Sequence, residues 1–560
     1  MRHGTYRLFE LQYATDFSQQ ANAHCYSLSP LRCWKMTKAH SPLLKLAILL
    51  VFALALRLIF LHGVSPGDPF TYSLSAWDIV QGQWNPAYFY EQTTRWGLLF
   101  PLAASYRVFG INDVSSALWP LLTSLGTVAV AYRLALHLKG ERAALWAGIL
   151  VATFPLEIIY ATQPMADCPL SFWLLLSLYC FVRGEAAATG KRWFFFFSGS
   201  ALALAYATKF VAILIAPFFL LALLWRRRIE WNWAWLGAGF LLLFAIEFVI
   251  FQRVTGNGLA RLNLILHDQV SNAPVTAGGF QVQNATWLYL YWMLVDFHYV
   301  GLSFLALLLM LLHRIAKYWR TKQSILGESW ILLLWALTFL LVLSFYPIST
   351  RPYIPLYKIE VYMLMFSAPL LVLTAVWLSE YTRQWQWTGI ALIVLSSLPF
   401  VYLLHESYRA HGDNARAIFA FAQTHPDRPV YAHRSDQRYL QYFAGFQQNA
   451  RYRNFRLPKP VEDVHPTPPI DFNHSYIAIN QYLLDYHRED TYPPEILNPP
   501  VNWRAVYTYQ RPEHWLRRVG IRVAGYLQTK GWIRQSAYQT ISGKFRNWSH
   551  TKPTIIYSTD

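Results

Sequence analysis

Two acidic and two basic side chains stand out in this sequence because of their positions relative to long apolar blocks. Asp68 follows the first block, Asp167 opens a later one, and Lys209 interrupts an otherwise apolar stretch. Arg95 lies in the segment between the first two blocks. A carboxylate can take a proton from a hydroxyl group, and an arginine can hold a phosphate with its planar fork. These residues therefore predict a charged site with acidic and basic groups, without naming a reaction.

Each of these charges also has an ordinary structural explanation. An aspartate can cap a helix, and Asp68 before Pro69 has the form of a helix start with proline in the first turn. Asp167 can cap its apolar block in the same way, and Lys209 can reach lipid headgroups with its long side chain. Capping and snorkelling both stay open from the sequence alone.

The composition indicates the surroundings of these residues. Hydrophobic residues make up 55% of the 560 residues and charged residues 14%, whereas charged residues account for about a quarter of a soluble domain. Long apolar blocks fill residues 43–404, and the remainder is polar. We therefore expect an integral membrane protein with a soluble C-terminal domain.

Apolar blocks of roughly 20 residues predict about eleven membrane spans, since lipid offers no partner for an unpaired backbone group. The blocks are 43–61, 116–138, 143–160, 169–182, 193–207, 211–225, 233–251, 287–312, 330–346, 361–378 and 388–404. Lys and Arg collect in every second connection, as in cytoplasmic loops. This alternation predicts a cytoplasmic N-terminus and an extracytoplasmic position for residues 63–115, Lys209 and the C-terminal region.

The sequence divides into three regions with one prominent loop. Residues 1–42 are expected to form a cytoplasmic arm, 43–404 the membrane domain and 405–560 an extracytoplasmic domain. The first outside loop, 63–115, has the pattern of helices lying at the membrane surface. Strands at 429–432 and 476–479 and a helix at 415–423 are expected in the C-terminal domain. The fold class is thus predicted as a mainly α, polytopic membrane bundle with a small C-terminal α/β domain.

Further ionisable residues lie within or near the ends of predicted spans: Glu157, Glu247, Asp296 and His298. A charge in the membrane costs at least a few kcal/mol unless it is paired or wet. These groups therefore line a cavity or transport path, or they pair with partners inside the bundle.

The net charge of +18 falls largely at the ends of apolar blocks and through the tail, so we interpret it as membrane topology rather than nucleic-acid binding. The 4 cysteines have no metal-ligand spacing and form no disulfide framework.

Several motifs, taken in order, resemble the GT-C glycosyltransferases related to dolichyl-phosphate-mannose protein mannosyltransferases and bacterial lipid A aminoarabinose transferases. The resemblance covers roughly residues 43–225, with a weaker echo to about 400. Its motifs are GDP at 67–69, RWGL at 95–98, YRVFG at 106–110, KGERAA at 139–144, DCPLSF at 167–172, TK at 208–209 and KIEVY at 358–362. Pro69 stands where many relatives have a second acid, and residues 94–96 replace a Glu-Lys-Pro segment of the aminoarabinose transferases.

The resemblance implies a role for each candidate site residue. Asp68 matches the catalytic acid of the first outside loop, and Asp167 matches the second acid of the family. The basic residues that contact the carrier phosphate match Lys209, Arg95 and Lys358, and Tyr362 belongs to the same later segment as Lys358.

The implied activity is inverting transfer of a sugar from a polyprenyl-phosphate carrier to a hydroxyl group of a protein, lipid or glycan acceptor. Asp68 would take the acceptor proton while Lys209 and Arg95 neutralise the departing phosphate. Asp167 would orient Asp68 or a basic partner, or hold a divalent cation, which is the one cofactor considered. The partners expected are the donor, the acceptor and membrane lipids, without nucleic acid, and the family implies a bacterial cytoplasmic (inner) membrane.

A transporter or flippase of lipid-linked sugars is the main alternative, because it would also be polytopic with intramembrane charges. Transporters often consist of two related halves, and the sequence shows no convincing internal repeat. A non-catalytic scaffold with a partner-binding tail leaves the charged site unexplained.

Overall fold

A computed structural model describes most of the chain. The described residues are 42–86, 91–226, 230–267, 285–322, 327–350, 353–447, 450–455, 470–487, 492–536, 538–539, 542–543 and 551–560. The predicted N-terminal arm, apart from residue 42, lies outside these ranges, as do Cys25 and Cys33.

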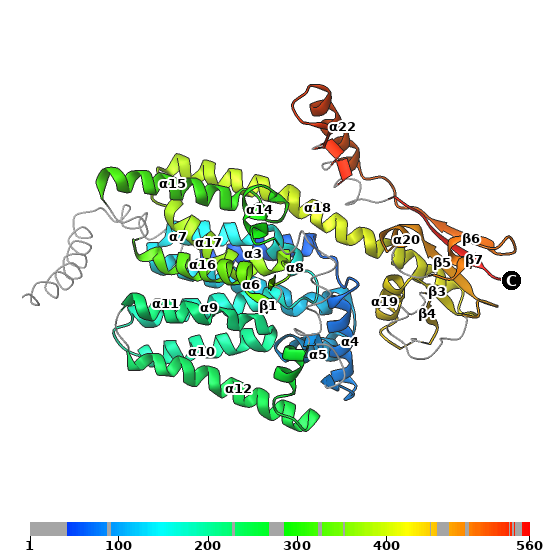
Figure 1. Ribbon diagram of the computed structural model, residues 1–560, viewed down its shortest axis with the longest axis horizontal. Helices are drawn as coiled ribbons and strands as arrows, with labels where there is room; N and C mark the ends of the chain where they lie inside the picture. Colours follow the sequence, from blue (N-terminus) through cyan, green and yellow to red (C-terminus); the bar gives the residue numbers. More distant parts are fainter. Residues whose placement is uncertain are drawn as a thin grey trace, which may run out of the picture.

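The membrane domain is a bundle of helices that run alongside one another (Figure 1). Its elements are α3 (Pro42–Ile59), α6 (Asp113–Lys139), α7 (Glu141–Ala152), α8 (Pro155–Tyr160), α9 (Asp167–Ala186), α10 (Lys191–Thr208), η3 (Phe210–Ile215), α11 (Ala216–Arg226), η4 (Trp231–Trp233), α12 (Ala234–Thr255), α14 (Leu288–Leu294), η5 (Phe297–Tyr299), α15 (Ser303–Thr321), η6 (Gly327–Ser329), α16 (Trp330–Phe345), η7 (Glu360–Met363) and α17 (Leu364–Leu378). Every residue of α17 is buried, so this apolar helix forms the centre of the bundle and the others surround it.

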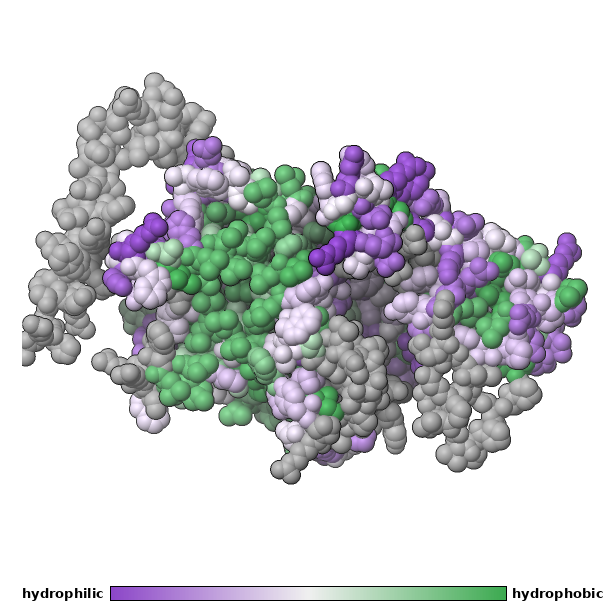
Figure 2. All heavy atoms as spheres, turned by 45° about the horizontal axis from the view of Figure 1, so that its top comes forward, coloured by the Kyte–Doolittle hydropathy of each residue, from purple (hydrophilic) through white to green (hydrophobic). Residues whose placement is uncertain are grey.

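Several of these helices suit a membrane. In the described residues, 5 helices are long and apolar enough to cross one, and two shorter apolar helices lie at Phe210–Leu224 and Trp330–Phe345. Figure 2 shows the matching surface, where hydrophobic side chains gather over the bundle and hydrophilic ones toward the C-terminal domain. Each predicted block contains at least one helix, while the count of about eleven spans and their direction stay predictions.

The structure corrects two blocks that we predicted as single spans. The block 143–160 is divided into α7 and α8, because Pro155 favours extended backbone at Phe154, whose φ and ψ are −70° and 124°. The block 287–312 is divided into α14, η5 and α15. There Gly301 adopts a φ of 60°, and a Cβ on it would lie 2.5 Å from the Ser397 hydroxyl, so a side chain would not fit.

The first outside loop covers one end of the bundle (Figure 1). It contains α4 (Asp68–Val80), η2 (Glu91–Thr94) and α5 (Trp96–Phe109), which confirms the helices predicted there. Gly97 lets α5 approach the end of α10, since a Cβ on Gly97 would lie 2.7 Å from the Thr208 hydroxyl. This close packing brings the residues before α5 next to Lys209, which follows α10.

The helix α18 (Arg383–Thr424) joins the membrane bundle to the C-terminal domain without a break. The predicted domain boundary at 404/405 and the predicted helix 415–423 both fall inside it. Figure 1 shows α18 leaving the bundle and reaching the C-terminal sheet, where Ile418, Phe421 and Ala422 pack against the strands.

The C-terminal domain is built on a five-stranded sheet of order β4-β3-β5-β7-β6. Its elements are β3 (Val430–Ala432), α19 (Arg434–Phe443), β4 (Tyr452–Asn454), β5 (Tyr476–Asn480), α20 (Gln481–Tyr486), α21 (Pro494–Leu497), β6 (Arg504–Tyr509), α22 (Trp515–Thr529) and β7 (Thr554–Ser558). Strand β3 is parallel to β4 and β5, whereas β7 is antiparallel to β5 and β6. The predicted strands at 429–432 and 476–479 are confirmed as β3 and β5.

Side chains of the first loop hold the C-terminal domain against the bundle. Arg416 of α18 forms an ion pair of 2.9 Å with Asp113 at the start of α6. Tyr442 of α19 shares a hydrogen bond of 2.8 Å with Ser116, and Phe446 packs edge-on against Phe70 of α4. The loop 63–115, which contains Asp68, therefore lies between the bundle and the C-terminal domain.

Candidate active site

A buried ion pair joins two of the predicted site residues. Lys209, directly after α10, donates a hydrogen bond of 2.8 Å from Nζ to Oδ1 of Asp167, the first residue of α9. Lys209 is 4% exposed and Asp167 is 1% exposed, and Asp167 makes no capping hydrogen bond to its helix. Both ordinary explanations are therefore wrong here: Asp167 is not a cap, and Lys209 does not reach out to lipid headgroups.

The Lys209 ammonium also contacts Tyr362, which the resemblance assigns, like Lys209, to binding of the donor phosphate. The Lys209 ammonium lies 4.7 Å from the centre of the Tyr362 ring, where the electron-rich face stabilises a cation. Tyr362 belongs to η7, which leads into the central helix α17. Three elements distant in sequence thus fix the position of one positive charge.

Arg95 is held by a second buried pair, which the sequence analysis missed. Its Nε lies 2.9 Å from Oε2 of Glu91, one turn earlier, and its guanidinium also donates to the Tyr72 hydroxyl of α4. Burial disfavours both charges, but the Glu91 carboxylate and Tyr72 raise the pKa of Arg95, and the Arg95 charge lowers the pKa of Glu91. The spacing of four residues between Glu91 and Arg95 is a sequence signal for an ion pair, but oppositely charged residues at this spacing are common in helices.

Asp68 differs from the other two acids because its carboxylate is not engaged. It is the first residue of α4, whose cap position is Gly67, and no side chain caps that helix. Asp68 is partly exposed, and it forms no hydrogen bond or ion pair through its side chain with the described residues. Its charge nevertheless acts on Arg95 and on Tyr72. Because the Asp68 carboxylate lies near Arg95 but forms no hydrogen bond to it, this carboxylate can accept a proton.

Lys358 stands apart from the cluster in its contacts. It is buried, and its Nζ donates to the backbone carbonyl of Leu356 at 3.3 Å. Burial lowers the pKa of Lys358 to about 8, and no carboxylate among the described residues is paired with it. The structure therefore brings together Arg95, Lys209, Asp167 and Tyr362, and leaves Lys358 as an unpaired cation shortly before Tyr362 in the chain.

The described acids do not form a cluster of metal ligands. Within the described ranges, no group of three or more His, Cys, Asp and Glu side chains is placed to hold a metal ion. Of the two acids considered for a cation, Asp167 has one oxygen bound to Lys209. A third ligand is thus missing from the described residues, and we derive no step through a cation.

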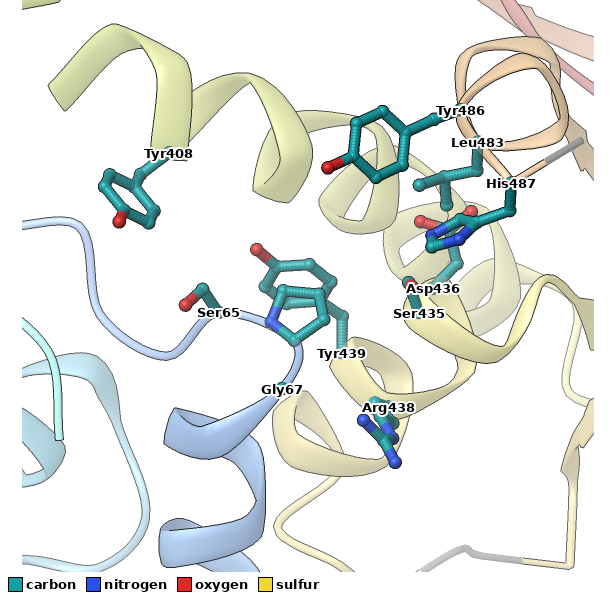
Figure 3. Close-up of a pocket in the computed structure, with 11 residues that line it drawn as sticks. Ser65, Gly67, Tyr408, Ser435, Asp436, Arg438, Tyr439, Leu483, Tyr486 and His487 are labelled. Carbon is teal, nitrogen blue, oxygen red and sulfur yellow. The ribbon is translucent and has the colours of Figure 1, made fainter. Parts of the chain in front are cut away.

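A cavity of about 360 Å³ opens between the first loop and the C-terminal domain, and Gly67, the residue before Asp68, lines it. Its walls come from the turn before α4, from α18, from α19 and from α20 and the residue after it. Figure 3 shows the tyrosines, Arg438, Asp436 and His487 around it. The lining residues are Ser65, Pro66, Gly67, Tyr408, Ser435, Asp436, Arg438, Tyr439, Leu483, Tyr486 and His487. Sequence reasoning missed these residues because they come from segments far apart in the chain.

The charges predicted near the membrane interior are mostly paired. Glu247 of α12 binds Arg261 at 2.7 Å and accepts a hydrogen bond of 2.6 Å from the Trp96 indole. Asp296 and His298 lie within hydrogen-bonding distance of each other. Pairing inside the bundle, rather than an open transport path, is therefore confirmed for Glu247, Asp296 and His298.

Comparison with known proteins gives the same fold. The structure aligns with ArnT from Cupriavidus metallidurans bound to undecaprenyl phosphate, with a TM-score of 0.55 and 15% identity over 83% of this chain and 96% of that chain. It aligns with the apo form of the same protein with a TM-score of 0.54 and 15% identity, over 82% and 95% of the two chains. For the oligosaccharyltransferase of Archaeoglobus fulgidus the TM-score is 0.52 and the identity 11%, over 93% and 89%.

The chain has the GT-C glycosyltransferase fold. A family model described as dolichyl-phosphate-mannose-protein mannosyltransferase also matches residues 97–251, so the resemblance seen in the motifs is confirmed. No curated protein matches the chain in sequence. The apolar helices and the shared fold together show an integral membrane protein.

The stretch matched by the family model covers only part of the site. Residues 97–251 include Asp167 and Lys209, which form the buried ion pair, and exclude Asp68, Arg95 and Lys358. The family model therefore does not cover Asp68, and the role proposed for Asp68 rests on the residues around it in the structure.

Proposed function

We propose that this protein is a membrane glycosyltransferase that moves a sugar from a polyprenyl-phosphate carrier to a hydroxyl acceptor on the extracytoplasmic face. The observation that carries the proposal is the unbound Asp68 carboxylate, whose charge acts on the buried Arg95, while Arg95 in turn lies close enough to act on the buried Lys209. The shared fold supports it, since ArnT binds undecaprenyl phosphate.

The reaction that fits this arrangement is a single displacement with inversion. The acceptor oxygen attacks the anomeric carbon while Asp68 takes the hydroxyl proton, and the bond from that carbon to the phosphate oxygen breaks with its electron pair. The products are the new glycoside, protonated Asp68 and a polyprenyl phosphate with one more negative charge. This step needs one unbound carboxylate. Asp68 supplies it, since Asp167 is bound to Lys209.

The charges of the cluster explain why a further cation is needed for the departing phosphate. Arg95 is already paired with Glu91 and Lys209 with Asp167, so neither is a free cation. Lys358, which has no carboxylate partner among the described residues, supplies the third positive charge in our mechanism. An ammonium in a water-poor site stabilises developing phosphate charge strongly.

The cavity between the first loop and the C-terminal domain is proposed as the acceptor site. The cavity is lined by Gly67, the residue before Asp68. In our proposal, an acceptor hydroxyl group bound there approaches Asp68, the general base. The volume of about 360 Å³ is near the lower end of the usual range of roughly 300–1,000 Å³ for small-ligand sites. Replacing a tyrosine of its wall, as in Tyr439→Ala, is expected to raise KM for the acceptor and leave KM for the donor unchanged.

The function is tested by sugar transfer with purified protein and a pool of polyprenyl-phosphate sugars. Wild type is expected to form a glycosylated product, and Asp68→Asn is expected to form none while it stays folded. Asp78→Asn is the matched control, since Asp78 lies on the same helix and outside the cluster. Movement of the lipid across a bilayer that is independent of Asp68, without any transfer, would favour a flippase instead.

A further inference from the structure

Helix α22 in the C-terminal domain carries a stripe of apolar side chains that the transfer reaction does not use. Trp515, Val519, Val523 and Tyr526 are between 44% and 57% exposed. Their spacing of three or four residues places them on one face of the helix. Trp532, which follows the helix, is 73% exposed and extends the surface.

The opposite face of α22 is already occupied, so the helix has a defined orientation. Ala524 is buried at 2% exposure, and Gly525 faces the Tyr538 ring. Arg517 donates a hydrogen bond of 3.1 Å to Thr551, shortly before β7. The exposed stripe is thus the face of α22 opposite to the side that contacts Tyr538 and Thr551.

Basic side chains border this stripe. Arg518, Arg522, Lys530 and Arg534 are all exposed, and the Lys530 ammonium lies 5.7 Å from the centre of the Tyr526 ring. Arg522 and Arg534 form no ion pair with any residue that the structure describes. Among the described residues, the acid that pairs with arginines of α22 is Glu513, whose carboxylate lies 3.9 Å from Arg518. The surface therefore combines apolar and aromatic residues with an excess of positive charge.

The start of α22 is fixed at the end of the last predicted membrane span. His514 caps the helix by accepting the Leu516 amide hydrogen, and its other ring nitrogen is hydrogen-bonded to the Tyr402 hydroxyl of α18. Tyr402 lies two residues before the end of the span predicted at 388–404. Figure 1 shows α22 beside α18 and away from the C-terminal sheet.

We propose that α22 lies in the membrane interface and binds anionic phospholipid headgroups. Trp515, Val519, Val523 and Tyr526 would enter the boundary between headgroups and acyl chains, while Arg518, Arg522 and Lys530 contact the phosphates. A helix with an apolar aromatic face and a basic border binds such a surface through buried area and charge together. The charge and the attachment at the membrane boundary favour lipid over a protein partner.

The test measures the depth of α22 in a bilayer with the full chain in lipid nanodiscs. Val523→Cys carries an environment-sensitive fluorophore, in a background with Cys25→Ser and Cys33→Ser, since Cys168 and Cys180 are buried. Val506→Cys on β6 is the matched control, because Val506 is 41% exposed and Val523 is 51% exposed. Phospholipids with brominated acyl chains quench a fluorophore only where it enters the bilayer.

The label at position 523 is expected to be quenched, more strongly with anionic phospholipid than with phosphatidylcholine alone, and the label at 506 is expected to be unaffected. Arg518→Gln with Arg522→Gln is expected to weaken the anionic preference by about fivefold per residue, and Arg504→Gln on β6 is expected to leave it unchanged. Equal quenching at 523 and 506 would overturn the proposal. Protection of position 523 from water without quenching by bromine would assign the stripe to a protein contact and also overturn it.

Discussion

The membrane bundle and the C-terminal domain hold their buried acids in different ways. The bundle wall is the group of Asp167, Lys209, Arg95 and Lys358, and the C-terminal wall is the part of the cavity lined by α19 and α20. In the membrane bundle, Asp167 is bound to the Lys209 ammonium at 2.8 Å. In the C-terminal domain, Asp436 is buried with the Asn480 amide as its partner at 3.1 Å, and burial raises the pKa of Asp436 to about 7. Apart from Lys358, the bundle wall therefore holds charges that are fixed in ion pairs. In the C-terminal wall, the Asp436 carboxyl is about half protonated near pH 7.

This difference suits the two substrates of the proposed reaction. An anionic donor needs positive charge that is already in place, because a preorganised site need not reorient as the phosphate leaves. An acceptor hydroxyl needs hydrogen-bond partners, which the tyrosines and Asp436 around the cavity provide. The comparison predicts that substitutions in the bundle wall impair stabilisation of the donor phosphate. Substitutions in the C-terminal wall are expected to weaken acceptor binding.

Breaking the Asp167–Lys209 pair is expected to have the largest effect on folding. Lys209→Met alone leaves a buried carboxylate unpaired, and Asp167→Leu alone leaves a buried ammonium, at a cost of about 3–5 kcal/mol each in the free energy of unfolding. The double variant removes both charges and is expected to recover most of that stability, but not transfer activity. Thermal unfolding in detergent measures this, and equal stability of all four proteins would show that the pair is not buried.

The next largest effect is expected at Lys358, which tests whether the bundle wall depends on its unpaired cation. Lys358→Met is expected to lower kcat/KM roughly 10²-fold with little loss of stability. Because burial lowers the pKa of Lys358 to about 8, wild-type kcat/KM is expected to fall as the pH rises through about 8. Lys358→Arg stays charged and is expected to move this decline to higher pH, and an unchanged profile would contradict the assignment.

The effect expected at Asp436, in the C-terminal wall, is on the pH dependence of stability rather than on transfer. Its pKa is about 7 in the folded protein and close to 3.9 in an unfolded chain, so the folded state binds more protons between these values. Stability is therefore expected to decrease as the pH rises from about 4 to 7, by roughly 1.4 kcal/mol per unit at most. Asp436→Asn, which keeps the shape, is expected to remove this dependence in unfolding experiments.

The sequence predicted the bundle wall better than the C-terminal wall for a physical reason. Asp167 and Lys209 are isolated charges in apolar blocks, and an isolated charge in such surroundings must find a partner. Glu91 was missed because it lies outside the apolar blocks, where a charge needs no partner to be explained. The helix positions followed from apolar blocks of membrane length, which are a local signal.

The C-terminal wall depends on contacts between distant residues. Strand β7, at the end of the chain, inserts between β5 and β6, and no local pattern specifies that register. Likewise, Phe446 meets Phe70 of α4, so the cavity exists only after the domain docks. The predicted strands β3 and β5 were found because each is a short apolar run, whereas β4 and β6 are largely polar or exposed.

The most direct test of the account is chemical rescue of the general base. Asp68→Ala is expected to lower transfer from the polyprenyl-phosphate sugar by roughly 10²–10⁴-fold, and added formate is expected to restore part of the rate by taking the acceptor proton. Asp78→Ala measures the effect of formate on a protein with an intact site. Transfer by Asp68→Ala at the wild-type rate would contradict the proposal that Asp68 is the catalytic base.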